Sequence, residues 1–173
     1  HQNVVDPSKS HNRTNDRMNP SSRSSKLNIK FPKKFHPARQ KAIKALKIKN
    51  YDEAIIYLTE LLDKYPDSYS IRCDRGEAYM NIKEYERAKR DLDLAVQKKP
   101  KKERGLYLRG IVHDKLNNPR ESISDLCKAI KIKPNDPSTL DALKICAKHY
   151  KELGNFDDAI KHLELVLKLE ENN

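Results

Sequence analysis

The sequence predicts an all-α solenoid of four helix–turn–helix units, a fold in which similar units stack one on the next. Two kinds of residue recur 34 positions apart: prolines that end helices and small residues that allow close packing. They are Pro66, Pro100 and Pro134; Ala42, Gly76 and Gly110; and Ala54, Ala88 and Ser122. The composition agrees, because 35% of the chain is charged and it has only four glycines. A solenoid needs little apolar mass, since each unit buries only its contacts with its neighbours.

Residues 1–35 are predicted to form a basic, largely disordered leader. They carry eight Lys or Arg against two Asp, which gives +6 of the formal net charge of +11. Apolar residues are too few there to offset the entropy cost of ordering the segment. Towards the end of the leader, Leu27, Ile29, Phe31 and Phe35 alternate with polar residues, and we expect this stretch to lie extended against the first unit.

From Pro37 onward, apolar periodicity and turn residues predict four pairs of helices. The pairs are 37–48 with 52–65, 69–82 with 86–99, 103–116 with 119–133, and 139–153 with 156–170. They divide a repeat domain, residues 36–173, into units at about 36–68, 69–102, 103–136 and 137–173. Each proline of the 34-residue series ends a second helix. Pro119 begins one, at a position where a missing N–H costs nothing.

The fourth unit is offset from the series. Ala159 follows Ser122 by 37 residues, and the three additional residues fall in the turn-forming segment 135–139. Inside each unit the spacing is constant, because the small residue of the first helix always precedes that of the second by 12 positions. We expect this constancy where two helices of one unit pack closely.

The order of large and small residues is specific. The second unit contains Arg75-Gly76, Tyr79, Ala88, Leu92, Ala95 and Pro100, and the third contains Leu106, Arg109-Gly110, His113, Ser122, Leu126, Ala129 and Pro134. The fourth follows with Leu143, Cys146-Ala147, Tyr150, Ala159 and Leu163; the first matches least, because Lys41 and Ala45 replace larger apolar residues. This order resembles the tetratricopeptide repeat family over residues 36–170. The resemblance implies a right-handed superhelix whose first helices line a concave groove for a peptide or a short helix.

Helical spacing places one set of side chains in that groove: Arg39, Ile43, Asp74, Glu77, Tyr107, Leu108, Ile111, Lys144, Lys148 and Lys151, with Leu46, Cys73, Asn81, Asp114 and Ile145 beside them. Tyr107, Leu108 and Ile111 are the predicted apolar anchors, and Lys144 and Lys148 the charge partners. The groove therefore suits a partner with apolar side chains and an acidic end. The alternative interpretation is that these residues form ordinary solvated helix faces.

One known use of such grooves is not predicted. Some members of the family clamp the C-terminal carboxylate of chaperone tails with Lys, Asn and Arg side chains. Ile43 and Asp74 stand where the asparagines would be, and Leu108 stands where the arginine would be. A buried Asp74 would repel a carboxylate.

The sequence predicts a non-enzymatic adaptor without cofactors, in the cytoplasm or nucleus. No nucleophile has a positioned histidine and no glycine-rich phosphate loop occurs. Cys146 and His149 lie three residues apart, but no second pair stands at ligand spacing, so no metal site is predicted. An odd number of cysteines, three, indicates reduced thiols. No apolar run approaches 18 residues, so no membrane association is predicted.

Two other functions stay open at this stage. The basic leader with Phe31 and Phe35, together with the lysine cluster at 98–102, suits nucleic-acid binding. The last helix presents one apolar stripe, Ile160, Leu163, Val166 and Leu167, and no polar capping helix follows it, which suits self-association. A third interpretation is that the leader folds back into the groove, near the acidic residues of the groove.

Overall fold

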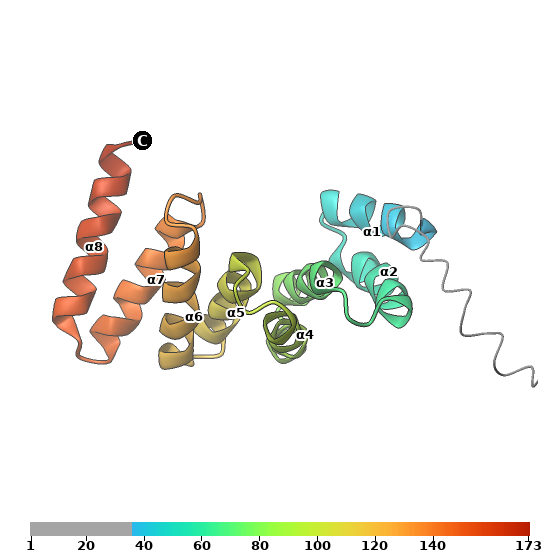
Figure 1. Cartoon of the computed structure of the whole chain (residues 1–173), viewed down its shortest axis with the longest axis horizontal. Helices are drawn as coiled ribbons and strands as arrows, with labels where there is room; N and C mark the ends of the chain where they lie inside the picture. Colours follow the sequence, from blue (N-terminus) through green and yellow to red (C-terminus); the bar gives the residue numbers. More distant parts are fainter. Residues whose placement is uncertain (1–35) are drawn as a thin grey trace, which may run out of the picture. The chain divides into compact units, whose positions relative to one another are not determined.

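Eight α-helices account for most of the chain that the computed structural model describes, residues 36–173 (Figure 1). Their bounds are α1 Pro37–Lys47, α2 Tyr51–Lys64, α3 Tyr69–Asn81, α4 Tyr85–Lys98, α5 Glu103–Lys115, α6 Pro119–Ile132, α7 Thr139–Glu152 and α8 Phe156–Glu171. Every bound lies within one residue of the expected position. The predicted all-α solenoid is confirmed over these residues. The expectations for the leader, 1–35, concern residues outside the described range.

The turn between the two helices of each unit has one repeated geometry. One residue adopts a left-handed backbone conformation: Lys49 (φ 58°), Lys83 (φ 63°), Asn117 (φ 58°) and Gly154 (φ 80°). The next residue then donates its N–H to a carbonyl five positions back, as in Asn50 to Ala45 and Asn155 to Tyr150, 2.9 and 2.8 Å. This bond satisfies a carbonyl that the helix end would leave unpaired. The repeated turn gives all four units the same entry into the second helix.

Small residues let the two helices of a unit approach closely, as predicted. A Cβ on Gly76 would lie 2.8 Å from Leu92 Cγ, and one on Gly110 would lie 2.6 Å from Leu126 Cγ. Ser122 is fully buried and donates its hydroxyl to the Gly110 carbonyl at 2.8 Å. The glycines are therefore required by leucine packing from the partner helix.

The apolar core is distributed along the array in consecutive clusters. Each helix packs on the next, and in addition α3 contacts α5 and α5 contacts α7. First helices of successive units thus lie closer to one another than second helices do, which places them on the inner side of the stack, with α1 and α8 at opposite ends of the array (Figure 1).

The aromatic residue that begins a second helix packs differently in the fourth unit than in the first and second. Tyr51 and Tyr85 pack half-buried against core clusters, but Phe156 at the start of α8 is 61% exposed. Tyr85 rests on a cluster that includes Leu108 and Val112 of the following unit. No described helix follows α8, so Phe156 has nothing equivalent to pack against. None of the described helices is long and apolar enough to cross a bilayer.

Candidate functional site

The predicted groove residues lie on the four first helices, α1, α3, α5 and α7. Ile43, Lys144, Lys148 and Lys151 are exposed, and Arg39, Asp74, Glu77, Tyr107 and Ile111 are partly exposed. Among the flanking candidates, Asn81 is exposed and Leu46, Asp114 and Ile145 are partly exposed. Most of these side chains are therefore at least partly open to solvent on the first helices.

Two of the candidates belong to the core instead. Leu108 is only 4% exposed and Cys73 is fully buried, in one cluster with Leu92, Ala95 and Val112. Leu108 faces the junction with α4, because an apolar side chain at this position gains more from packing than from solvent. The expectation that Leu108 is an exposed anchor was wrong. Asp74, the equivalent residue 34 positions earlier, is more exposed than Leu108. Equivalent positions in the repeat therefore do not have equal exposure, and spacing alone placed Leu108 wrongly.

The acidic residues of the inner surface are already paired with an arginine of the next first helix. Arg104 on α5 lies 2.7 Å from Asp74 Oδ1 and 2.9 Å from Glu77 Oε2, both on α3. Burial disfavours the charged guanidinium, but the two carboxylates outweigh it and raise the pKa of Arg104. Sequence reasoning missed Arg104. Helical spacing could have indicated it, since Arg104 lies one turn before Tyr107 and two turns before Ile111.

A second set of charges joins α5 to α7. Asp114 Oδ1 lies 2.6 Å from Lys148 Nζ and 2.8 Å from His149 Nε2, and the other ring nitrogen of His149 lies 3.0 Å from Glu152 Oε2. Lys144 pairs with Glu170 of α8 at 3.0 Å. Lys151 makes no ion pair with any residue in the described range. The inner surface is thus crossed by ion pairs that link consecutive first helices.

A cavity of about 420 Å³ lies where α7 and α8 meet. The three predicted lysines, Lys144, Lys148 and Lys151, line it together with Phe156, Ile160 and Leu163 of α8. These apolar side chains are each about half exposed or more. The structure therefore combines two features that the sequence presented separately, the basic end of the groove and the apolar stripe of the last helix. Within that stripe Val166 is buried, so it is not part of the exposed surface.

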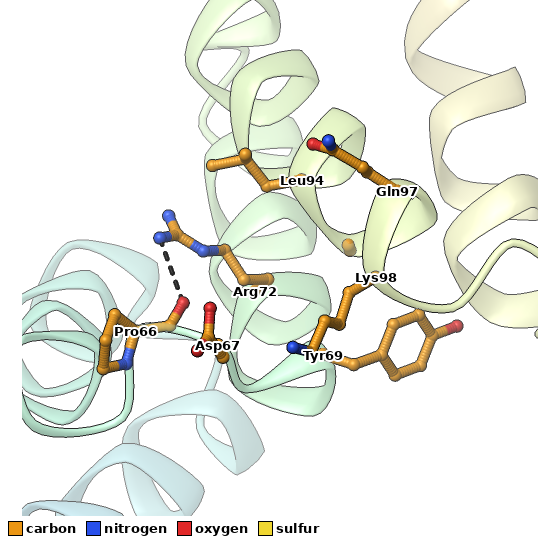
Figure 2. A pocket seen from close by; sticks show the side chains of 8 residues that line it. Pro66, Asp67, Tyr69, Arg72, Leu94, Gln97 and Lys98 are labelled. Carbon is orange, nitrogen blue, oxygen red and sulfur yellow. Dashed lines mark hydrogen bonds between the residues drawn. The ribbon is translucent and has the colours of Figure 1, made fainter.

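A cavity of about 450 Å³ lies elsewhere, beside the turn before α3 (Figure 2). Its lining includes Pro66, Tyr69, Arg72, Leu94 and Lys98, and none of the predicted groove residues. Arg72 donates to the Pro66 carbonyl at 3.2 Å, the dashed line in Figure 2, and to Asp91 at 3.0 Å. These bonds occupy the guanidinium of Arg72, so Arg72 is not free to bind a ligand in this cavity.

Comparison with known proteins identifies the family to which the chain belongs. The tetratricopeptide repeat profile matches residues 45–110, and a second profile of the same description matches 103–136 and 147–173. The chain therefore belongs to the tetratricopeptide repeat family. Sperm-associated antigen 1 is similar in sequence: the Homo sapiens protein is 29% identical over 110 residues and the Rattus norvegicus protein 27% over 103. These matches span 64% and 60% of this chain but only 12% of each relative.

Solved structures share the fold. MamA 41-end from Desulfovibrio magneticus RS-1 has a TM-score of 0.71 at 21% identity, covering 79% of this chain and 76% of that one. The first tetratricopeptide domain of Spaghetti (RPAP3), solved bound to the HSP90 peptide SRMEEVD, has a TM-score of 0.63 at 26% identity. That match covers 68% of this chain and 90% of that one. The Arabidopsis OM64 domain has a TM-score of 0.61 at 22% identity, covering 65% and 93%.

Proposed function

We propose that the chain is a protein-interaction adaptor that binds a peptide segment with apolar and acidic side chains at the α7–α8 end of its inner surface. The observation that carries the proposal is the cavity lined by three lysines and three exposed apolar residues of α8. An apolar pocket with a few charged groups at its edge is the usual form of a peptide site, because apolar contact gives affinity and charge fixes orientation.

The lysines are available to such a ligand. Lys144 and Lys148 keep 49% and 52% of their side chains exposed although each has an acidic partner. The Lys144–Glu170 pair is exposed on both sides, and such pairs contribute only about 0–1 kcal/mol, so exchanging Glu170 for a ligand carboxylate costs little. Asp114 is only 9% exposed and also pairs with His149, so Lys148 would bind a ligand without releasing Asp114. Asp74 and Glu77 are paired with Arg104, and we propose that they shape the middle of the groove while Ile43, Tyr107 and Ile111 offer apolar contact and Arg39 a cation near its other end.

The neighbour bound to the HSP90 peptide supports a protein ligand in general terms. Its peptide combines apolar and acidic residues, the chemistry that the α7–α8 cavity suits. The carboxylate clamp itself is not proposed here, because Ile43, Asp74 and Leu108 stand at positions where clamping members carry Asn and Arg, and Leu108 is in the core.

A pull-down from nuclease-treated lysate tests the proposal. We expect a protein retained by the natural chain and lost with Lys144→Glu, Lys148→Glu, Lys151→Glu, and also lost with Ile160→Asp, Leu163→Asp. The matched control is Lys44→Glu, Lys47→Glu, Lys49→Glu, which makes the same charge change on the exposed end of the first unit. Equal retention by the first variant and the control would contradict the proposal.

Nucleic-acid binding is the second candidate, and one observation favours it. Lys98, Lys99, Lys101 and Lys102 are all exposed at the turn between α4 and α5. Phosphate contacts release counterions, so this function requires an affinity that falls steeply with salt. Binding to a single-stranded oligonucleotide that persists at high salt, or that is unchanged when these lysines become glutamine, would reject it.

A further inference from the structure

Three side-chain positions recur along the repeats and meet in the structure from the second unit onward. One position lies on the first helix of a unit, and another lies on the second helix of the same unit. The remaining position lies on the second helix of the preceding unit. In the third unit they hold Arg109, Asp125 and Asp93. Arg109 Nε lies 2.7 Å from Asp125 Oδ2, and its Nη1 lies 3.2 Å from Asp93 Oδ1.

The second unit repeats this arrangement 34 residues earlier. Arg75 Nε lies 2.7 Å from Asp91 Oδ2, and its Nη1 lies 3.1 Å from the hydroxyl of Thr59. In the first unit the corresponding pair is Lys41 and Tyr57, with the ammonium 5.5 Å from the ring centroid. A cation on the first helix thus holds a partner on the second in all three units.

The fourth unit changes all three positions together. The fourth unit is offset by 37 residues, so Cys146 stands at the position of Arg109 and His162 at that of Asp125. Cys127 lies before the offset and stands 34 residues after Asp93, at the equivalent position. The arginine and its two acidic partners become two thiols and an imidazole. Their ligand atoms, two sulfurs and one ring nitrogen, all lie within 4.8 Å of one another and come from α7, α8 and α6.

The hydrogen bond that His162 makes leaves its other ring nitrogen able to bind a cation. His162 Nδ1 lies 2.8 Å from the Asp158 carbonyl oxygen, which can only accept, so this nitrogen carries the proton and leaves Nε2 with a free lone pair. A backbone carbonyl holding the other nitrogen is the usual arrangement around a metal-bound histidine.

We propose that Cys127, Cys146 and His162 bind one zinc ion. Two thiolates and one imidazole are ligands that zinc prefers, with Zn–S about 2.3 Å and Zn–N about 2.0–2.1 Å, so the cluster must contract by roughly 1 Å or less around the ion. Three ligands leave the fourth position of a tetrahedral site open. Cys146 is fully buried and the other two are partly buried, so the site is largely screened from water. The ion would join α6, α7 and α8.

His149, which the sequence placed beside Cys146, is not a member. Both its ring nitrogens face carboxylate oxygens, at 2.8 and 3.0 Å. Sequence spacing could not find the true set, because its members lie 19 and 16 residues apart on three helices.

Cobalt(II) is the probe for the first test, on the full chain kept reduced. We expect one equivalent of cobalt to give a thiolate-to-metal charge-transfer band, and one equivalent of zinc to remove that band and raise the melting temperature. His162→Ala should weaken cobalt binding by more than about 100-fold, since the loss of an outer-shell partner alone costs about 10–100-fold. Cys127→Ser should abolish the charge-transfer band of the bound ion or reduce it strongly, whereas Cys73→Ala, which removes the thiol outside the cluster, should bind as the natural chain does.

A restoring variant separates binding from folding. Cys127→Asp, Cys146→Arg and His162→Asp together rebuild the network of the third unit, so this variant should fold, take up no metal and show no zinc-dependent melting. The proposal is overturned if the reduced natural chain shows no stoichiometric charge-transfer band. It is also overturned if the band survives in the restoring variant, or if His162→Ala binds as tightly as the natural chain.

Discussion

At the scale of single residues, the fold depends on carboxylates that are almost completely removed from water. The side chains of Asp91 and Asp125 are 3% and 4% exposed, and each is held by an arginine through two hydrogen bonds. The hydrogen bonds that Arg109 donates to Asp125 raise the pKa of Arg109 despite the cost of burying it. Burying charges in this way stabilises a fold only while both partners are present.

Arg109→Ala should therefore be strongly destabilising. It leaves Asp125 buried without its cation, and we expect the free energy of unfolding to fall by about 3–5 kcal/mol in urea titrations. The matched control is Arg87→Ala, whose pair with Glu84 is long, 3.9 Å, and exposed on both sides. That change should stay within about 0.5 kcal/mol. Similar losses for the two variants would contradict this account of the buried pair.

His113 should make stability depend on pH. Burial lowers its pKa in the folded chain below the ordinary value of 6.5, and its Nδ1 lies 3.3 Å from the Asn118 amide nitrogen. Below about pH 6.5 the unfolded chain takes up a proton that the folded chain does not. Its contribution to stability is therefore present above that pH and is lost as the pH falls towards the lowered folded pKa.

The comparison variant is His113→Tyr, because Tyr79 and Tyr150 occupy the equivalent positions in the neighbouring units. Urea unfolding at about pH 7.5 and about pH 5.5 brackets the ordinary histidine pKa. The natural chain should lose more stability between the two than the variant does. Equal losses in both proteins would show that His113 is not responsible.

At the scale of helices, the sequence predicts where each element lies but not all of what it contacts. Helix bounds depend on local signals, such as Pro119 at a first turn and the small residues at constant spacing. Both ends of all eight helices were predicted to within one residue. Contacts between units depend on the angle at which helices meet. Leu108 and Arg104 show this, since a single helical face cannot indicate that one is covered by α4 and the other reaches across to α3.

Caps of the second helices differ, and this difference is measurable. Asn50 accepts a hydrogen bond from the Glu53 N–H at 3.3 Å, and its amide donates to the Glu53 carboxylate at 2.9 Å. Glu84 at the same position of α4 makes no side-chain cap bond. Asn50→Ala should cost about 1 kcal/mol by thermal or urea unfolding, and Glu84→Ala much less. If both variants lose the same amount, the cap bond of α2 contributes nothing.

At the scale of the whole described array, stability is a sum of contacts between neighbours, because helices meet mainly the helices before and after them. The last helix, α8, packs on α7 and exposes Ile160, Leu163, Leu165 and Leu167. Interior helices have neighbours on both sides. Local opening should therefore be easiest at the ends of the stack.

Hydrogen exchange followed by mass spectrometry should show this gradient. We expect amides in α8 and α1 of the metal-free chain to exchange faster than those in α3 to α6, since fewer packed neighbours must separate to expose them. Uniform protection over all eight helices would show instead that the array unfolds only as one cooperative body. Protection of α8 that exceeds that of α5 would require a partner on its exposed face.

The three recurring side-chain positions have a consequence for measurement. One backbone geometry accommodates an ammonium over a ring, a guanidinium on carboxylates, and a thiol pair with an imidazole, at sites related by the repeat. Backbone geometry, burial and solvent exposure are thus largely matched between these sites, while the side-chain chemistry varies. Transplanting each set into the same unit would give a direct thermodynamic ranking of cation–π, ionic and metal-mediated attachment between two helices, a comparison that unrelated proteins cannot offer.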